Sequence, residues 1–188
     1  MGIIDGRLAM VHRSDNRPYA EGLHFLARIV QETMCLAYFY RRLEGQLAGG
    51  TLHGVECEQA RWSQIACFKA IVVNVAKLLE DRKDTWNLVQ LHKEWSKYVP
   101  DRKVHHQTMT AIHTLRKKLA WVQGRRHERE AHQTKADQLT LLTALPPSMD
   151  FVKEVAEVMD LFVEGKIPYQ LYLHESGEEI DLRAQFGI

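Results

Sequence analysis

Residues 19–47 read YAEGLHFLARIVQETMCLAYFYRRLEGQL and carry a regular hydrophobic pattern. Apolar side chains recur there mostly at steps of three and four residues, at Leu23, Leu26, Val30, Met34, Phe39, Leu43 and Leu47. This spacing gathers them on one face of an α-helix, which has about 3.6 residues per turn. The segment GGTLHG, residues 49–54, is rich in glycine and ends that helix. The stretch therefore predicts a long amphipathic helix.

The next part of the chain predicts two further helices. A second stripe indicates a helix over about residues 56–80, and its apolar positions are Trp62, Ile65, Phe68, Val72, Val75 and Leu79. Asp84 is the expected N-cap of a short helix over about residues 85–98. Pro100 ends that helix, because proline lacks the backbone N–H that helix continuation requires.

Two more helices are expected before the tail. Asp101 can cap a fourth helix that runs over about residues 102–122, with apolar positions Val104, Thr108, Ile112, Leu115, Leu119 and Val122. Ser148, after the segment LPPS, is the expected cap of a fifth helix. That helix places Phe151, Val155, Val158 and Phe162 on one face.

The C-terminal tail allows two interpretations. Residues 170–186, QLYLHESGEEIDLRAQF, alternate like a β-hairpin around Ser176 and Gly177, whereas Ser176 and Glu179 also fit a capping box for a last helical turn. No internal repeat and no alternation of strands with helices is found. We therefore expect an all-α protein: one domain over residues 1–188, built as a bundle of about five helices, with an N-terminal arm (1–18) and a C-terminal tail (168–188).

Composition limits the function classes. Lys and Arg total 25 against 24 Asp and Glu, so the net charge of +1 excludes a protein that coats nucleic acid through bulk charge, and any anion site must be local. The three cysteines lack CxxC spacing and indicate a reducing compartment. No run of 18 apolar residues and no signal peptide is present, so we expect a cytoplasmic protein without a membrane anchor.

One charged segment, residues 121–137 (WVQGRRHEREAHQTKAD), interrupts the helical pattern. Continuing the apolar stripe of the fourth helix at about 100° per residue puts Arg126 at its centre. The same count puts Arg129 nearer the stripe and the other basic residues on its flanks, at Arg125, His127 and His132. A buried arginine without a partner would cost several kcal/mol, roughly. Arg126 must therefore meet a carboxylate, an anion or an open cleft, and composition alone leaves these alternatives open.

Arg126, five intervening residues and His132 resemble the Arg-x(4–6)-His motif of the HEPN superfamily of small helical ribonucleases and RNA-binding domains. Upstream, residues 76–88 (AKLLEDRKDTWNL) and 111–123 (AIHTLRKKLAWVQ) are similar to its bacterial abortive-infection branch. The similarity spans about residues 61–165. His127 and Gln133 depart from the small polar residues usual at those positions. Arg125 also satisfies the spacing, but the helical stripe favours Arg126.

Metal-free RNA cleavage needs these residue types. The ribose 2′-hydroxyl attacks the adjacent phosphate, which requires a proton acceptor near neutral pH, such as histidine, and a cation such as the planar guanidinium for the developing charge. The resemblance implies His132 as general base or acid, Arg126 as the phosphate-stabilising group and His127 as an auxiliary residue. The remaining basic residues form a solvated surface that is a candidate for RNA phosphate contacts: Arg125, Arg129, Arg116, Lys117 and Lys118.

The resemblance also implies a homodimer. On one helix Arg126 and His132 would lie about 120° apart and about 9 Å along the axis, so a two-fold partner is needed to bring both to one phosphate. The expected function is a metal-independent endoribonuclease in phage defence or as a toxin, with RNA as substrate and a cognate antitoxin as partner. The alternatives are a HEPN-like dimer that binds RNA, nucleotide or protein without cutting, and a bundle in which the motif forms structural salt bridges.

No metal or cofactor is expected. His106 and His113 could share a helix face, with His105 beside them, but no nearby cysteine or carboxylate completes a ligand set.

Overall fold

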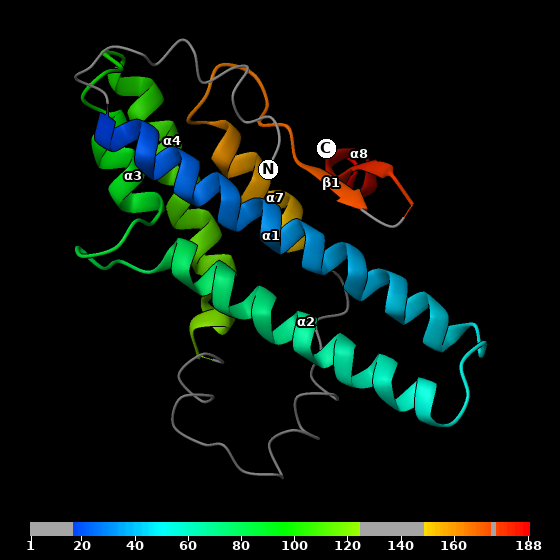
Figure 1. Cartoon of the computed structure of the whole chain (residues 1–188). Helices are drawn as coiled ribbons and strands as arrows, with labels where there is room; N and C mark the ends of the chain where they lie inside the picture. Colours follow the sequence, from blue (N-terminus) through cyan, green and yellow to red (C-terminus); the bar gives the residue numbers. More distant parts are fainter. Residues whose placement is uncertain (1–16, 125–148, 174–175) are drawn as a thin grey trace.

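The protein is described by a computed structural model over residues 17–124, 149–173 and 176–188. Helices dominate these ranges: α1 (Arg17–Ala48), α2 (Val55–Leu79), α3 (Leu88–Trp95), α4 (Arg102–Lys118), α7 (Asp150–Asp160) and α8 (Leu182–Phe186). The strands β1 (Gln170–Leu173) and β2 (Glu178–Asp181) form an antiparallel hairpin (Figure 1). The prediction of a mostly helical protein is confirmed. The tail is a hairpin followed by a short helix, which Asp181 caps and Ser176 does not.

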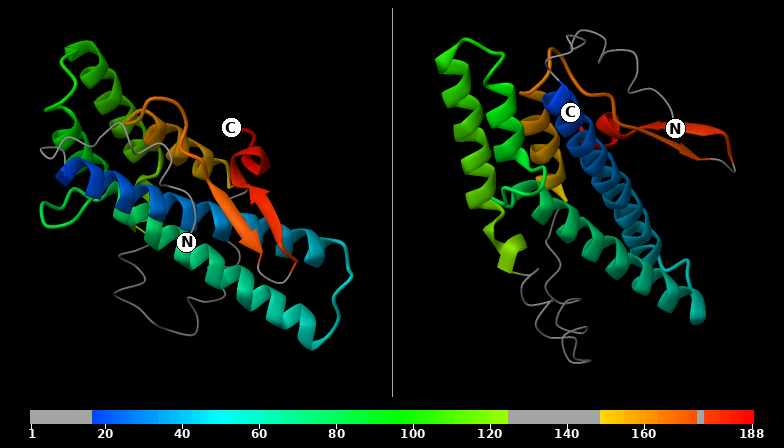
Figure 2. Two further views of the ribbon diagram at one scale, coloured as in Figure 1. Left: turned by 45° about the horizontal axis from the view of Figure 1, so that its top comes forward. Right: turned by 60° about the vertical axis from the view of Figure 1, so that its left-hand side comes forward.

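The two longest helices form an antiparallel pair. α1 and α2 lie side by side, and their connected ends extend beyond the rest of the molecule (Figures 1 and 2). The predicted stripe of α1 is buried from Leu23 to Met34. Beyond Met34 the core face continues through Ala37 and Tyr40. The prediction that Phe39 is buried is wrong, because this residue is 36% exposed. The five-residue step from Met34 to Phe39 breaks the helical period, and the burial follows the period.

α2 is buried along its second half. Its predicted core positions from Ile65 to Leu79 are buried, but Trp62 is 54% exposed, because it lies toward the far end of the pair. Within the described ranges α2 is also the helix whose length and composition would suit a membrane span, although half of that apolar window is buried in the protein. The buried half packs against α1 and α3. A helix buried in the core of a globular protein can have the same apolar composition as a membrane span.

The N-terminal ends of α3 and α4 show which of the predicted N-cap residues are used. Asp101 does cap α4, accepting a hydrogen bond of 2.8 Å from the backbone N–H of Lys103. Asp84 does not cap α3. The buried Asn87 accepts from the N–H groups of Val89 and Gln90, each at 3.0 Å, so α3 begins three residues later than predicted. The Asp84 carboxylate is instead hydrogen-bonded to Arg82, which lowers its pKa. Ser148 lies outside the described residues.

α7 packs as its stripe predicts. Phe151, Val155, Val158 and Phe162 are all buried, and the hydroxyl of Tyr19 in α1 donates to the Phe162 carbonyl. After α7 the chain returns through β1 and β2 beside α1, and the side chain of Gln31 donates to the Gln170 carbonyl at 2.8 Å.

A buried ion pair attaches the C-terminus to α7. Nη2 and Nη1 of Arg183 in α8 lie 2.6 and 3.1 Å from the two carboxylate oxygens of Asp160. Nη1 also donates to the Ile167 carbonyl at 2.9 Å, and the Arg183 side chain is only 8% exposed. A bidentate pair with this geometry fixes the position of α8.

Gly22→Ala is expected to destabilise the protein, although alanine favours helix. A Cβ at Gly22 would lie 2.5 Å from Cε3 of Trp86, so the half-buried indole would have to move, at about 1–3 kcal/mol. Gly45→Ala in the same helix is the matched control, because nothing lies within 4 Å of its Cβ. It should stabilise by about 0.5–1 kcal/mol. Urea unfolding measures both; equal effects of the two variants would contradict the close contact with Trp86.

Asp160→Ala is expected to lower the free energy of unfolding by about 3–5 kcal/mol, because it leaves the Arg183 guanidinium buried without its counter-charge. Glu157→Ala in the same helix removes only the exposed pair with Lys153, at 3.9 Å, and should change stability by less than about 1 kcal/mol. Thermal and urea unfolding give both values. A loss below 1 kcal/mol for Asp160→Ala would show that the pair does not hold α8.

Candidate functional site

The helix that leads to the Arg126–His132 motif is interrupted. α4 ends at Lys118, and Leu119 takes φ −101° and ψ 20°, after which residues 120–124 are helical again. Leu119 and Val122 are buried as predicted. The expectation of one regular helix through residue 122 is nevertheless wrong, because the backbone at Leu119 changes the rotation per residue.

This interruption bears on the predicted direction of the motif. The count of about 100° per residue that put Arg126 at the centre of the stripe assumes a regular helix. The predicted site residues in the motif lie outside the described residues: Arg125, Arg126, His127, Arg129 and His132. Their roles therefore stay predictions.

The other three predicted phosphate contacts lie at the end of α4. The Arg116 guanidinium is 3.6 Å from the Asp81 carboxylate, and its side chain is mostly covered. Lys118 is paired with Glu154 of α7. Lys117 is exposed, and no ion pair to it is found within the described ranges. The structure thus ties two of the three cations to acidic neighbours and leaves Lys117 open.

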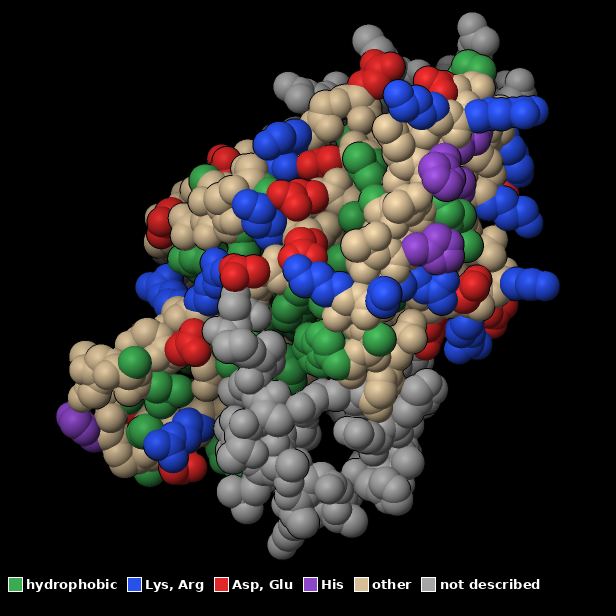
Figure 3. Space-filling view, turned by 180° about the vertical axis from the view of Figure 1, so that it is seen from behind, with side chains coloured by type: hydrophobic (Ala, Val, Ile, Leu, Met, Phe, Trp, Pro, Cys, Tyr) green, Lys and Arg blue, Asp and Glu red, His purple; other side chains and the backbone are tan. Residues whose placement is uncertain are grey.

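α4 as a whole is cationic. Between Arg102 and Lys118 it contains five Lys or Arg residues, three histidines and no Asp or Glu. Basic residues in its last turn also interact favourably with the partial negative charge of the helix C-terminus. Figure 3 shows basic and histidine side chains following one another along one side of the molecule. The sequence contains this signal, since no acidic residue interrupts residues 102–118, but the prediction covered only Arg116, Lys117 and Lys118.

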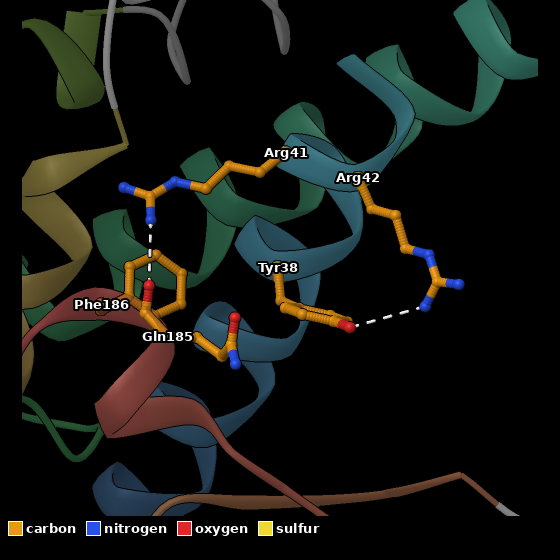
Figure 4. A pocket seen from close by; sticks show the side chains of 5 residues that line it. All are labelled: Tyr38, Arg41, Arg42, Gln185 and Phe186. Atoms are coloured by element: carbon orange, nitrogen blue, oxygen red, sulfur yellow. Dashed lines mark hydrogen bonds between the residues drawn. The ribbon is translucent and has the colours of Figure 1, made fainter. Parts of the chain in front are cut away.

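A shallow pocket of about 250 Å³ lies between α1 and α8 (Figure 4). The Arg41 guanidinium stands 4.4 Å from the centre of the Phe186 ring and donates to the Gln185 carbonyl and the Asp150 carboxylate, at 3.4 and 3.3 Å. Arg42 makes one long hydrogen bond, 3.5 Å, to the Tyr38 hydroxyl. The sequence alone does not reveal this pocket, because the pocket depends on the fold of the tail. Arg41 is used to attach α8, which leaves Arg42 as the open cation.

Two histidines are used structurally between α3 and α4. The buried His92 donates from Nε2 to the His105 carbonyl at 3.2 Å, and His105 donates from Nε2 to the Val99 carbonyl at 2.6 Å. Both rings lie against Trp95, with centroids 5.8 and 5.6 Å away. Burial lowers the pKa of His92, and the adjacent His105 acts in the same direction, whereas the hydrogen bond opposes them. The His105 ring is therefore engaged in structural contacts, while His106 and His113 face solvent.

Clusters of metal-ligating side chains and two of the cysteines can be assessed in the part of the chain that the structure describes. No group of three or more His, Cys, Asp or Glu side chains there could hold a metal ion. Burial raises the pKa of the Cys35 thiol to about 11 and also raises that of Cys67, which disfavours the reactive thiolate.

Comparison with known proteins adds no assignment: no family model, curated protein or solved structure matches the chain.

Protein stability is expected to fall as the pH drops below about 6.5, in part through His92. Unfolded histidine has a pKa near 6.5, and burial keeps the folded value lower, so the unfolded state binds more protons in that window. The contribution of His92 is complete above about pH 6.5 and is lost on acidification toward its folded pKa, at no more than about 1.4 kcal/mol per pH unit. His92→Gln should flatten the curve, while His106→Gln should not. Identical curves for both variants would contradict this role.

Proposed function

We propose that the protein is a metal-independent endoribonuclease of the HEPN type that cleaves RNA by attack of the 2′-hydroxyl on the adjacent phosphate. The observation that carries the proposal is the Arg126-x5-His132 motif, which pairs a permanent cation with a proton-transferring group. His132 acts as general base or acid, Arg126 stabilises the phosphate, and His127 assists. Activity in phage defence or as a toxin, in the cytoplasm and under control of an antitoxin, belongs to the same proposal.

Two features of the described chain support this proposal. Helices dominate the described residues up to Gly124, two residues before Arg126, which agrees with a small helical nuclease. The preceding helix α4 carries five Lys or Arg residues and no carboxylate, which suits a substrate with one negative charge per nucleotide.

A homodimer completes the proposed site. Two copies of the motif around a two-fold axis would bring two arginines and two histidines to one groove. Their charges repel, so apolar neighbours such as the half-buried Trp121 would hold the interface.

Binding of RNA without cleavage is the second candidate function. His127 and Gln133 favour it, because both depart from the residues usual in the motif. The cationic surface of α4 needs no catalytic group to bind RNA.

Purified protein is expected to cut mixed RNA in the presence of EDTA and to leave 2′,3′-cyclic phosphate ends. His132→Ala should lower the cleavage rate by at least about 100-fold, because it removes the proton-transferring group. The matched control is His24→Ala, an exposed histidine of α1, which should cut at the wild-type rate. Gel electrophoresis of labelled RNA and analysis of the 3′ ends measure these outcomes.

Light scattering and the cleavage assay together test the dimer. Arg126→Ala and His132→Ala should each keep the dimer mass by light scattering, and a mixture of the two should regain part of the activity. Cleavage that requires Mg²⁺, or that survives His132→Ala, would contradict the proposed mechanism. RNA binding without any product would favour the second candidate.

A further inference from the structure

The charge of α4 is segregated from that of the rest of the chain. The whole chain has 25 Lys and Arg against 24 Asp and Glu, yet the 17 residues of α4 contain five of these cations and no acid. The nearest acid in sequence is Asp101, whose carboxylate accepts the backbone N–H of Lys103 as the helix cap. A helix this one-sided produces a local positive field in a nearly neutral protein.

The exposed residues of α4 form a continuous stripe. Five of them recur at steps of three and four residues on the side opposite the core, at Lys103, His106, Thr110, His113 and Lys117. We call these five residues the outer stripe. Thr108, Ile112 and Leu115 anchor the other side of the helix in the core. At 1.5 Å per residue the outer stripe is about 21 Å long. Figure 3 shows this side of the molecule, with basic and histidine side chains open to solvent.

The acidic neighbours of α4 do not neutralise the outer stripe. Asp81 pairs with Arg116 and Glu154 pairs with Lys118, which lie beside the stripe at the helix end. Among the described residues no ion pair is found to Lys103 or Lys117. The stripe therefore presents two open lysines and two histidine rings with hydrogen-bond donors, and Arg102 adds a third open cation at its start.

We propose that the outer stripe of α4 is a docking surface for the phosphate backbone of an RNA strand. The inference rests on the proposed function for its choice of polyanion. Charge complementarity supports it, and a length of about 21 Å is enough to run past several phosphates; in duplex DNA, for comparison, those of one strand follow at about 3.4 Å along the axis. α4 contains no Phe, Tyr or Trp, so the surface has no platform on which bases could stack. Recognition is through the backbone and is independent of base sequence.

The test measures RNA binding without cutting. The full-length His132→Ala protein is titrated in EDTA against labelled 20-nucleotide RNAs of mixed, poly(U) and poly(A) sequence, with fluorescence anisotropy at several KCl concentrations. Three phosphate contacts would give a slope of log affinity against log salt of about −2. The three RNAs should bind within about threefold of one another, because the bases are not read.

Charge reversal locates the surface. Lys103→Glu with Lys117→Glu should weaken binding by at least about tenfold and reduce the salt slope by about 1 to 1.5. Arg61→Glu with Lys166→Glu makes the same change in net charge at exposed positions outside α4 and should weaken binding less than about threefold. Circular dichroism checks that both double variants keep their helix content. Equal losses in the two double variants, or binding to anionic lipid vesicles but not to RNA, would overturn the proposal.

Failure of this surface and failure of the proposed nuclease give different results. If wild-type protein cuts RNA and the α4 double variant binds and cuts equally well, the docking surface is wrong and the nuclease stands. If no protein cuts RNA but the α4 variant alone loses binding, the nuclease is wrong and the surface stands.

Discussion

The described fold depends on the burial of α1. This helix of 32 residues packs against α2, α3, α7 and α8, which follow it at widely separated positions in the chain. At 1.5 Å per residue it is about 48 Å long, so each partner covers only a part of it. Short helices have little stability in water by themselves and gain it from packing an apolar face. α3 and α7 therefore gain part of their stability by packing against α1. The Tyr19 hydroxyl of α1 also donates a hydrogen bond to the carbonyl of Phe162, just after α7.

Two arginines hold the C-terminus by different physics. Arg183 is buried and paired with Asp160, so its charge is shielded from water. Removing either partner would leave the other charge buried without its counter-charge and would lower the stability of the fold. Arg41 lies at the surface, where its contact with the Phe186 ring is mainly cation–π and its ion pair with Asp150 is weakened by solvent. The buried pair fixes where α8 sits on α7, and the exposed arginine joins α8 to α1. The pocket beside Arg41 is a consequence of this attachment.

Helical periodicity predicted the long elements because it reports which face is buried, and a long helix gives many positions to average. Periodicity gave wrong predictions where a tertiary contact determines which residue caps a helix or becomes buried. Asp84 and Asn87 are both good caps in sequence, and only the burial of Asn87, with its amide bonded to the Arg82 and Thr85 carbonyls, selects it. Trp62 fits the stripe of α2 but lies where few elements remain to cover it. The spacing of Arg126 and His132 in the sequence was enough to name the candidate catalytic pair. Their geometry could not be extrapolated from α4, because the helix is interrupted at Leu119.

The near-neutral charge of the chain disfavours attraction of nucleic acid at long range, but it does not describe the field close to a single helix. At physiological ionic strength a charge is screened over about 8 Å, whereas α4 is about 25 Å long by its rise per residue. A ligand at the outer stripe therefore meets the charges of α4 and its immediate neighbours, and acids on distant elements contribute little. Because Asp81 and Glu154 face Arg116 and Lys118 at the end of the helix, they leave the field along Lys103 and Lys117 positive. Net charge describes the solubility of this protein, and the arrangement of charge along one helix describes what that helix can bind.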